Sequence, residues 1–288
     1  MRNARVQIIQ VPYDSGNRSA RMGSGAEYFV NNGLAEVLQA EGCDVGIETI
    51  ESNAEFRAEI QTQFDLYRQL AERVAEAREN DKFPLVLSGN CGATLGVIAG
   101  AKRLGVIWFD AHGDFNTPET TASGFLDGMG LAIAAGICWK HLASSIPNFS
   151  PLSGRNILHV GGRDFDAEER KLFEQAEAIV VDAAAINQTD VRRALSSPIR
   201  NLLQTVETIH LHIDLDVHNP KEAPANEYVT EEGGLSVKQV VEAVEFIKED
   251  LAISSATIAA YDPRCDPQSK TLEVGFNLMR KILQQQKK

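Results

Sequence analysis

Two short segments of the sequence place aspartates directly after apolar runs. In VIWFDAHGDFN the apolar run ends at Asp110, and His112 and Asp114 follow at two-residue steps. Residues two apart in extended backbone project to the same side, so these three side chains would form one patch. Two carboxylates so close repel each other unless a positive charge lies between them. Taken alone, the segment could also be a solvated loop with a helix-capping aspartate.

The segment HLHIDLDVHNP repeats this arrangement, with Asp214 and Asp216 at the end of an apolar run. Strand interiors seldom contain Asp and buried charges need partners, so capping is a poor explanation for two such endings. A shared pair of divalent cations explains both, with one carboxylate from each strand bridging the ions. Oxygen ligands with one imidazole suit Mn²⁺ best, with other first-row metals as alternatives, and two such ions would bind and ionise a bridging water. His210 and His212 share the strand face of Asp214, and a structural role is favoured for both.

The elements that must position these residues alternate between apolar runs and helical patterns. Strands are predicted at Val6–Val11, Cys43–Ile47, Phe83–Leu87, Gly105–Phe109, Asn156–Val160, Ala178–Val181, Thr208–Ile213 and Ser255–Tyr261. Helices are predicted at Gly25–Gln39, Ala54–Asn80, Thr94–Ala101, Ala167–Gln175 and Ser236–Asp250, the last with Ser236 as its N-cap. This alternation predicts an α/β fold with a mainly parallel sheet, and no linker divides the chain, so one domain is expected. In such sheets the chemistry lies beyond the carboxyl ends of the strands.

Composition narrows the classes of function. A net charge of −12 repels nucleic acid and anionic membranes, so neither is an expected partner. The four cysteines are far apart and form no CxxC pair, which argues against a disulfide framework and favours a reducing compartment. The N-terminal residues are interpreted as a first strand and not as a signal peptide, and no apolar run approaches the roughly 20 residues of a membrane helix. A cytoplasmic protein with a small-molecule substrate is therefore expected.

The two aspartate segments and SGNCGATLGVIAG, in this order and spacing, resemble the arginase (ureohydrolase) family, which includes arginase, agmatinase and formimidoylglutamase. The resemblance runs from the first strand to about Pro263. It implies a single arginase-like catalytic domain over residues 1–288, a three-layer α/β/α fold, two divalent ions, and a homo-oligomer, trimer or hexamer. It implies a first metal site of Cys91, Asp110, Asp114 and Asp214. The second site would consist of His112, Asp110, Asp214 and Asp216, with Asp110 and Asp214 bridging.

The resemblance also implies roles outside the metal ligands. Asn116 and Ser123 fall where arginases contact the substrate carboxylate. The segment GGRDFDAEE looks like the one that meets the α-amino group, which points to Asp166 and, through it or a water, to Glu169. Two further roles are a hypothesis about the mechanism: Asp216, also a metal ligand, would accept or relay the proton of the attacking water. Asp127 would protonate the departing amine.

Several positions depart from the family pattern. Cys91 stands where a metal-binding His is usual, which is similar to the N-omega-hydroxy-L-arginine hydrolase of cycloserine biosynthesis; alternatively, Cys91 is a small buried residue beside a weak or absent first metal. Asp127 stands at a position where arginases have a proton-shuttling His, and a solvated loop residue is the other interpretation. Asn226 replaces a Thr. Ala260 replaces a Glu that meets the guanidinium, and Asp262 could compensate only if the loop were shifted.

These features predict a binuclear metal-dependent hydrolase that cleaves a C–N bond of a guanidino or hydroxyguanidino amino acid. N-omega-hydroxy-L-arginine or an arginine-like compound is the expected substrate. The alternative is a non-catalytic or metal-poor family member that acts in ligand sensing or assembly. A redox role for Cys91 is a weaker third interpretation, because no resolving cysteine lies nearby in the sequence.

Overall fold

The computed structural model describes residues 4–53, 55–228 and 233–284 and is built around one eight-stranded sheet. Every neighbouring pair of strands in the described sheet is parallel. The strand order is β4 (Asp44–Thr49), β1 (Arg5–Val11), β5 (Phe83–Ser88), β10 (Ala252–Ala259), β9 (Thr208–Asp214), β6 (Leu104–Phe109), β7 (Ile157–Val160) and β8 (Ile179–Val181). A separate short hairpin pairs β2 (Tyr13–Asp14) with β3 (Asn17–Arg18). Each predicted strand is present, and the predicted α/β class is confirmed.

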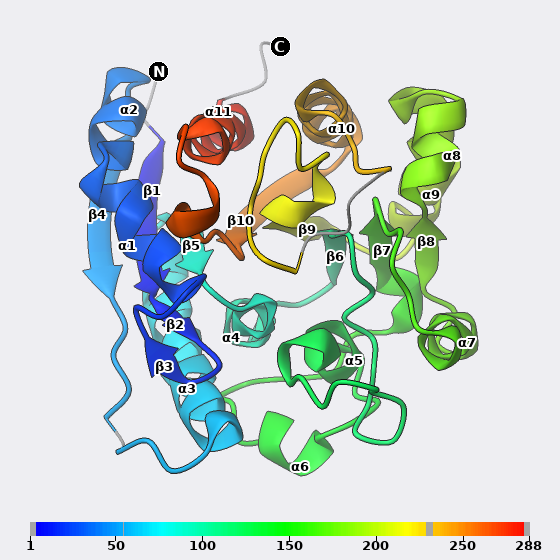
Figure 1. Ribbon diagram of the computed structural model, residues 1–288, viewed down its shortest axis with the longest axis horizontal. Coiled ribbons are helices and arrows are strands. Elements are labelled where there is room, and N and C mark those ends of the chain that lie inside the picture. Colours follow the sequence, from blue (N-terminus) through cyan, green and yellow to red (C-terminus); the bar gives the residue numbers. More distant parts are fainter. Residues whose placement is uncertain (1–3, 54, 229–232, 285–288) are drawn as a thin grey trace.

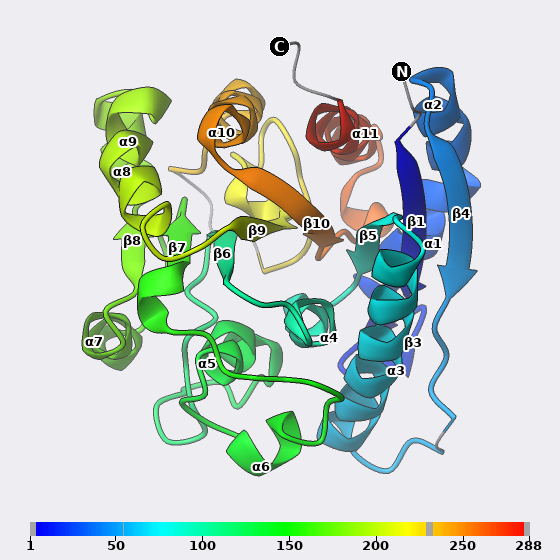
Figure 2. The ribbon, with the colours of Figure 1, turned by 180° about the vertical axis from the view of Figure 1, so that it is seen from behind.

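Helices cover both faces of the sheet, which gives three layers (Figures 1 and 2). One face carries α1 (Gly23–Asn31), α2 (Leu34–Ala40), α8 (Ala183–Gln188), α9 (Val191–Leu202), α10 (Val237–Asp250) and α11 (Lys270–Leu283). The other carries α3 (Glu59–Glu79), α4 (Thr94–Ile98), α5 (Gly130–Ala134) and α7 (Ala167–Gln175), with α6 (Lys140–Ala143) packed against α5. The central strands are mainly apolar because alternate residues enter the two cores, as Ile8 and Ile9 of β1 do.

Some predicted helices have different bounds. The predicted helix Gly25–Gln39 is two helices, because Gly33 adopts a left-handed φ of 96° between them. The predicted helix Ala54–Asn80 begins only at Glu59; Ala54 lies outside the described residues, and residues 55–58 are exposed, so no packing against the core supports a helical turn there. The predicted helix Thr94–Ala101 ends at Ile98. The helices α5, α6, α8, α9 and α11 were not predicted.

Two other helix predictions are confirmed. The helix Ala167–Gln175 has the predicted bounds. Ser236 caps α10, and its hydroxyl accepts a hydrogen bond from the N–H of Gln239 at 3.2 Å. Within the described ranges, no helix has the length and apolar character that a membrane crossing requires.

The carboxyl ends of four adjacent strands supply the polar segments that the sequence singles out. Cys91 begins a short 3₁₀ turn (Cys91–Ala93) after β5, and Asp110 directly follows β6. Asp214 is the last residue of β9, and Ala260 directly follows β10. Because parallel strands end at the same edge of the sheet, the fold brings these residues together.

Candidate metal centre and active site

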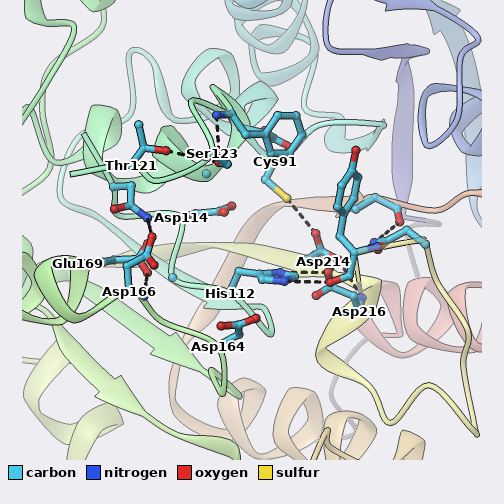
Figure 3. Close-up of a pocket in the computed structure, with 18 of the residues that line it drawn as sticks. Cys91, His112, Asp114, Thr121, Ser123, Asp164, Asp166, Glu169, Asp214 and Asp216 are labelled. Atoms are coloured by element: carbon cyan, nitrogen blue, oxygen red, sulfur yellow. Dashed lines mark hydrogen bonds and ion pairs between the residues drawn. The ribbon is translucent and has the colours of Figure 1, made fainter. Parts of the chain in front are cut away.

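A cavity of about 510 Å³ lies at this edge of the sheet (Figure 3). All the predicted site residues except Asp110 line it: Cys91, His112, Asp114, Asn116, Ser123, Asp127, Asp166, Glu169, Asp214 and Asp216. Asp110 is buried behind the wall, where its carboxylate accepts hydrogen bonds from the N–H of His112 at 2.7 Å and the indole N–H of Trp108 at 3.0 Å. Residues remote in the sequence therefore converge on one space.

Asp110, His112 and Asp216 form the first group of potential metal ligands. One ligand atom from each lies within 4.8 Å of the others. Nδ1 of His112 is 3.5 Å from Oδ1 of Asp110 and 3.3 Å from Oδ2 of Asp216. Nε2 of His112 lies 3.1 Å from the carbonyl oxygen of Tyr228, which can only accept a hydrogen bond. In a neutral imidazole the proton is therefore on Nε2, and the lone pair of Nδ1 faces two carboxylates, as a divalent cation between them would require.

The charges of this group also indicate a cation. Burial opposes protonation of His112, but Asp216 and Asp110 outweigh it and raise the pKa of the imidazole. Burial likewise opposes ionisation of Asp216, yet His112 lowers the pKa of that carboxyl. The protein alone thus attracts a positive charge to the point between His112 and Asp216, and a divalent ion can supply it.

Cys91, Asp214 and Asp114 complete the group of buried potential ligands, and Asp214 accepts a hydrogen bond from the N–H of Asp216 at 2.8 Å. The Cys91 thiol is buried and lies 3.1 Å from Oδ2 of Asp214. Burial, and then the charge of Asp214, raises the pKa of this thiol. Asp114 adopts a left-handed φ of 52°, and its buried Oδ2 has no hydrogen-bond partner among the described residues. Burial and neighbouring carboxylates raise the pKa values of Asp114 and Asp214. An orphaned carboxylate oxygen among buried acids fits a second cation.

The opposite end of the cavity holds polar groups suited to an amino acid. Asn116 donates a hydrogen bond to the carboxylate of Asp166 at 3.0 Å. Asp166 is the N-cap of α7, and Glu169 completes a capping box with it. Both oxygens of Glu169 accept backbone hydrogen bonds, from Phe115 at 2.8 Å and Asp166 at 3.2 Å, so Glu169 positions Asp166. Ser123 lies in the neighbouring exposed loop, where its hydroxyl accepts from the N–H of Phe125 at 3.2 Å.

Comparisons with known proteins identify this architecture. The model of the Arginase family matches residues 4–284. The chain belongs to this family. It is 30% identical to the arginase of Bacillus subtilis (strain 168) over 293 aligned positions, which cover 96% of this chain and 97% of that protein. The crystal structure of arginase from Bacillus cereus matches with a TM-score of 0.89 and 28% identity, over 99% of this chain and 100% of that one.

A solved structure of lower sequence identity is similar in fold. The formimidoylglutamase of Bacillus subtilis matches with a TM-score of 0.74 and 17% identity, over 98% of this chain and 86% of that one. The family and the three-layer fold that the sequence predicts are thus confirmed, and the chain is an arginase-family hydrolase.

Asp127, one of the departures from the family pattern, lies against the turn that carries Cys91. Its Oδ2 accepts hydrogen bonds from the side chain of Asn90 at 2.9 Å and the N–H of Cys91 at 3.0 Å. Its Oδ1 accepts from the N–H of Gly92 at 2.9 Å. Burial raises the pKa of Asp127 to about 7, although these hydrogen bonds oppose the rise. Asp127 therefore fixes the position of Cys91 in this arginase-family site, besides lining the cavity, and it is not a solvated loop residue.

Ala260 lines the cavity at the position where the family pattern has a Glu. Its carbonyl oxygen accepts a hydrogen bond from the side chain of Asn226 at 3.0 Å. Asp262 does not take the place of the missing acid. It is fully buried and accepts a hydrogen bond from the backbone N–H of Arg264 at 3.0 Å. The guanidinium of Arg264 forms an ion pair with it at 2.6 Å. The wall around Ala260 thus lacks the carboxylate that the family pattern places there.

The histidines of β9 differ from each other. His210 has both ring nitrogens hydrogen-bonded, to Ser255 at 2.9 Å and Thr257 at 3.2 Å, in agreement with a structural role. A ring nitrogen of His212, in contrast, lies within 4.8 Å of a Cys91 ligand atom and an Asp110 ligand atom. The sequence carries the signal for this placement, because His212 lies two residues before Asp214 on the same strand face, but the same signal applies to His210.

Proposed function

We propose that this arginase-family hydrolase cleaves a C–N bond of a guanidino or hydroxyguanidino amino acid with the help of two divalent cations. The observation that carries the proposal is the position of Asp110. It belongs to both groups of potential metal ligands, one with His112 and Asp216 and the other with Cys91 and His212. A carboxylate shared in this way is what a binuclear site requires.

The ligand roles we propose are those that the family resemblance implies, with Asp110 and Asp214 shared between the two ions. Cys91, Asp114, Asp110 and Asp214 would hold the first ion, and His112, Asp110, Asp214 and Asp216 the second. Oxygen donors and one imidazole at the second site favour Mn²⁺. When bound, the two ions would lower the pKa of a shared water and stabilise the charge that develops on attack at the central carbon of the substrate.

The remaining residues would orient the substrate and move protons. Asp216, beside His112, would accept the proton of the attacking water and hold that water in place. Asp127, in the cavity wall next to Cys91, would protonate the departing amine. Asn116, Ser123, Asp166 and, through Asp166, Glu169 would bind the amino-acid end, so that binding far from the reacting carbon fixes its orientation.

The part of the cavity near Ala260 favours a hydroxyguanidino substrate over arginine. A positively charged guanidinium would meet no carboxylate from Ala260 or Asp262 there, because Asp262 is paired with Arg264. The Cys91 position, which is similar to that of the N-omega-hydroxy-L-arginine hydrolase, favours the same substrate. The physiological setting we propose is a cytoplasmic homo-oligomer, a trimer or hexamer, as the family resemblance implies.

A panel of substrates, assayed on protein loaded in turn with Mn²⁺, Co²⁺, Zn²⁺ and Fe²⁺, tests the proposal. We expect urea or hydroxyurea to be released from arginine-like compounds, with the hydroxyguanidino substrate preferred. The proposal is contradicted if the metal-loaded protein releases neither urea, hydroxyurea, ammonia nor formamide from any guanidino or amidino compound tested. The alternative of a metal-poor, non-catalytic family member draws on the departures from the family pattern at Cys91, Asp127 and Ala260. Metal analysis decides, because close to two ions per chain would exclude that alternative.

A further inference from the structure

The imidazole of His212 is buried beside the proposed first metal site. His212 lies in β9, two residues before Asp214, and its side chain is fully buried. One of its ring nitrogens, a ligand atom of Cys91 and one of Asp110 lie within 4.8 Å of one another. Three different elements of the fold thus bring a sulfur, a nitrogen and an oxygen to one point: the turn after β5, the strand β9 and the end of β6.

The orientation of the His212 ring is fixed by two contacts. Its Nδ1 lies 2.8 Å from the hydroxyl of Thr94, the residue that begins α4 just after the Cys91 turn. Its ring stacks on Trp108, with centroids 3.7 Å apart and planes 18° from parallel. Its Nε2 is buried and has no hydrogen-bond partner within the described part of the chain. If Nδ1 donates its proton to Thr94, Nε2 presents a bare lone pair.

This is the arrangement of a metal-binding histidine, whose second ring nitrogen usually donates to an oxygen that fixes the ring. An unpartnered ring nitrogen is not enough by itself, because His159 and His218 each have one too. Neither of those residues is in a group of converging potential ligands among the described residues. His210, on the same face of the same strand, has both nitrogens engaged by hydroxyls.

We propose that Nε2 of His212 is a ligand of the cation held by Cys91 and Asp110. The inference rests on the proposed two-ion site and specifies its composition. Cys91 replaces the imidazole that the family pattern has after β5, and His212 would supply an imidazole to the same ion from β9. A donor set of thiolate, imidazole and carboxylate is softer than the set at the second site, which consists of carboxylates and one imidazole. The first site should therefore prefer Zn²⁺, Co²⁺ or Fe²⁺, while the second accepts Mn²⁺.

Titration of chelator-treated protein with Co²⁺ tests the assignment, because Co²⁺ bound to a thiolate absorbs in the near ultraviolet. His212→Phe keeps a ring to stack on Trp108 and removes both nitrogens. We expect this variant to bind the thiolate-bound Co²⁺ at least about 10-fold more weakly and with an altered visible spectrum. The matched control, His210→Phe, removes a buried histidine from the same strand face and should keep the affinity and spectrum of the unmodified protein. Thr94→Val removes the hydrogen-bond partner of Nδ1 and should weaken the binding of the same ion.

Proton NMR of the unmodified protein loaded with Co²⁺ gives a test that requires no variant to fold. Two contact-shifted imidazole N–H signals are expected, from His112 and His212; a single one overturns the inference. An unchanged affinity and spectrum of folded His212→Phe would overturn it as well, as would the lack of any thiolate band. A different result would contradict the proposed function. If the protein binds two ions and shows the His212 signals but hydrolyses no guanidino compound, the proposed activity is wrong and the ligand assignment is still supported.

Discussion

The carboxylate of Asp127 accepts a hydrogen bond of 3.0 Å from the backbone N–H of Cys91. Together with its hydrogen bonds from Asn90 and Gly92, this contact ties a buried acid to the turn that carries the proposed sulfur ligand. The same acid is the proposed proton donor to the leaving amine. One residue would thus couple the geometry of the first metal site to the last proton transfer.

Asp127→Asn should weaken both the turn and the site. The amide offers one acceptor oxygen, and its NH₂ group would face N–H donors, so at least one buried donor loses its partner. We expect the free energy of unfolding to fall by about 1–3 kcal/mol and the first ion to bind about 10-fold more weakly. Denaturant unfolding and metal titration measure the two effects. Asp164→Asn removes a charge from the same cavity wall and should change metal binding far less. A variant with unaltered metal affinity and a reduced kcat would show that Asp127 acts only on the proton.

Removal of metal ions should destabilise the protein. Burial and mutual repulsion raise the pKa values of Asp110, Asp114 and Asp214, so bound cations relieve an unfavourable clustering of charge. An ion present at a hundred times its Kd stabilises the folded state by about 2.7 kcal/mol. We therefore expect a chelator to lower the Tm by several degrees. Asp110→Asn alters the carboxylate common to both ligand groups and should reduce this difference in Tm. If the chelator does not change the Tm of the unmodified protein, the proposed metal site is contradicted.

Restoring the missing acid should shift the substrate preference toward arginine. Ala260→Glu places a carboxylate in the cavity wall where the guanidinium is expected, and Ala260 already adopts a left-handed φ of 62°, so the substitution adds little backbone strain. A charge-assisted hydrogen bond contributes about 1.5–3 kcal/mol. We expect the ratio of kcat/KM for arginine to that for N-omega-hydroxy-L-arginine to rise about 10-fold or more. Ala260→Gln, of equal length and no charge, is the control and should leave the ratio near its original value.

The sequence was sufficient for the sheet and for the central acids because both depend on local pattern. Apolar runs covered on two faces predict the parallel strands, and carboxylates directly after such runs predict a cluster at one edge. Helix α9 was missed although its buried apolar residues recur at helical spacing, because Pro198 lies within it and is read as a helix breaker. The segment Gly25–Gln39 looked like one helix because the left-handed turn at Gly33 leaves the spacing of apolar residues on either side nearly unbroken.

The rest of the site depends on contacts between distant residues. Asp127 reaches a turn about 36 positions earlier in the chain, and no local pattern pairs the two segments. His210 and His212 are equivalent in strand alternation. Ser255 and Thr257 of the neighbouring strand β10 hydrogen-bond both ring nitrogens of His210. Trp108 and Thr94, in contrast, orient the ring of His212 toward Cys91. Asp262 is adjacent to the cavity segment in the sequence, but Arg264 holds it in another direction. Such outcomes are decided by packing.

The pH dependence of stability should reveal the buried carboxyl of Glu169. Burial raises the pKa of Glu169 from 4.5 to about 7, although the two backbone N–H groups that it accepts from oppose the rise. The folded protein therefore keeps this proton up to about pH 7, whereas the unfolded chain loses it near pH 4.5. The contribution of Glu169 to stability is largest below pH 4.5, decreases between pH 4.5 and 7, and stays low above that range.

Glu169→Gln isolates this effect, because the amide has the same shape and does not titrate. Its carbonyl keeps one of the two backbone hydrogen bonds, and the loss of the other is the same at every pH. We expect the unfolding free energy of the original protein, relative to the variant, to decrease by up to about 3 kcal/mol between pH 4.5 and pH 7.5. Denaturant unfolding of both proteins in chelator measures the difference while the other titrating groups cancel. A difference that stays constant or increases with pH would mean that Glu169 is ionised throughout, and that its carboxylate is stabilised by the N–H groups of Phe115 and Asp166.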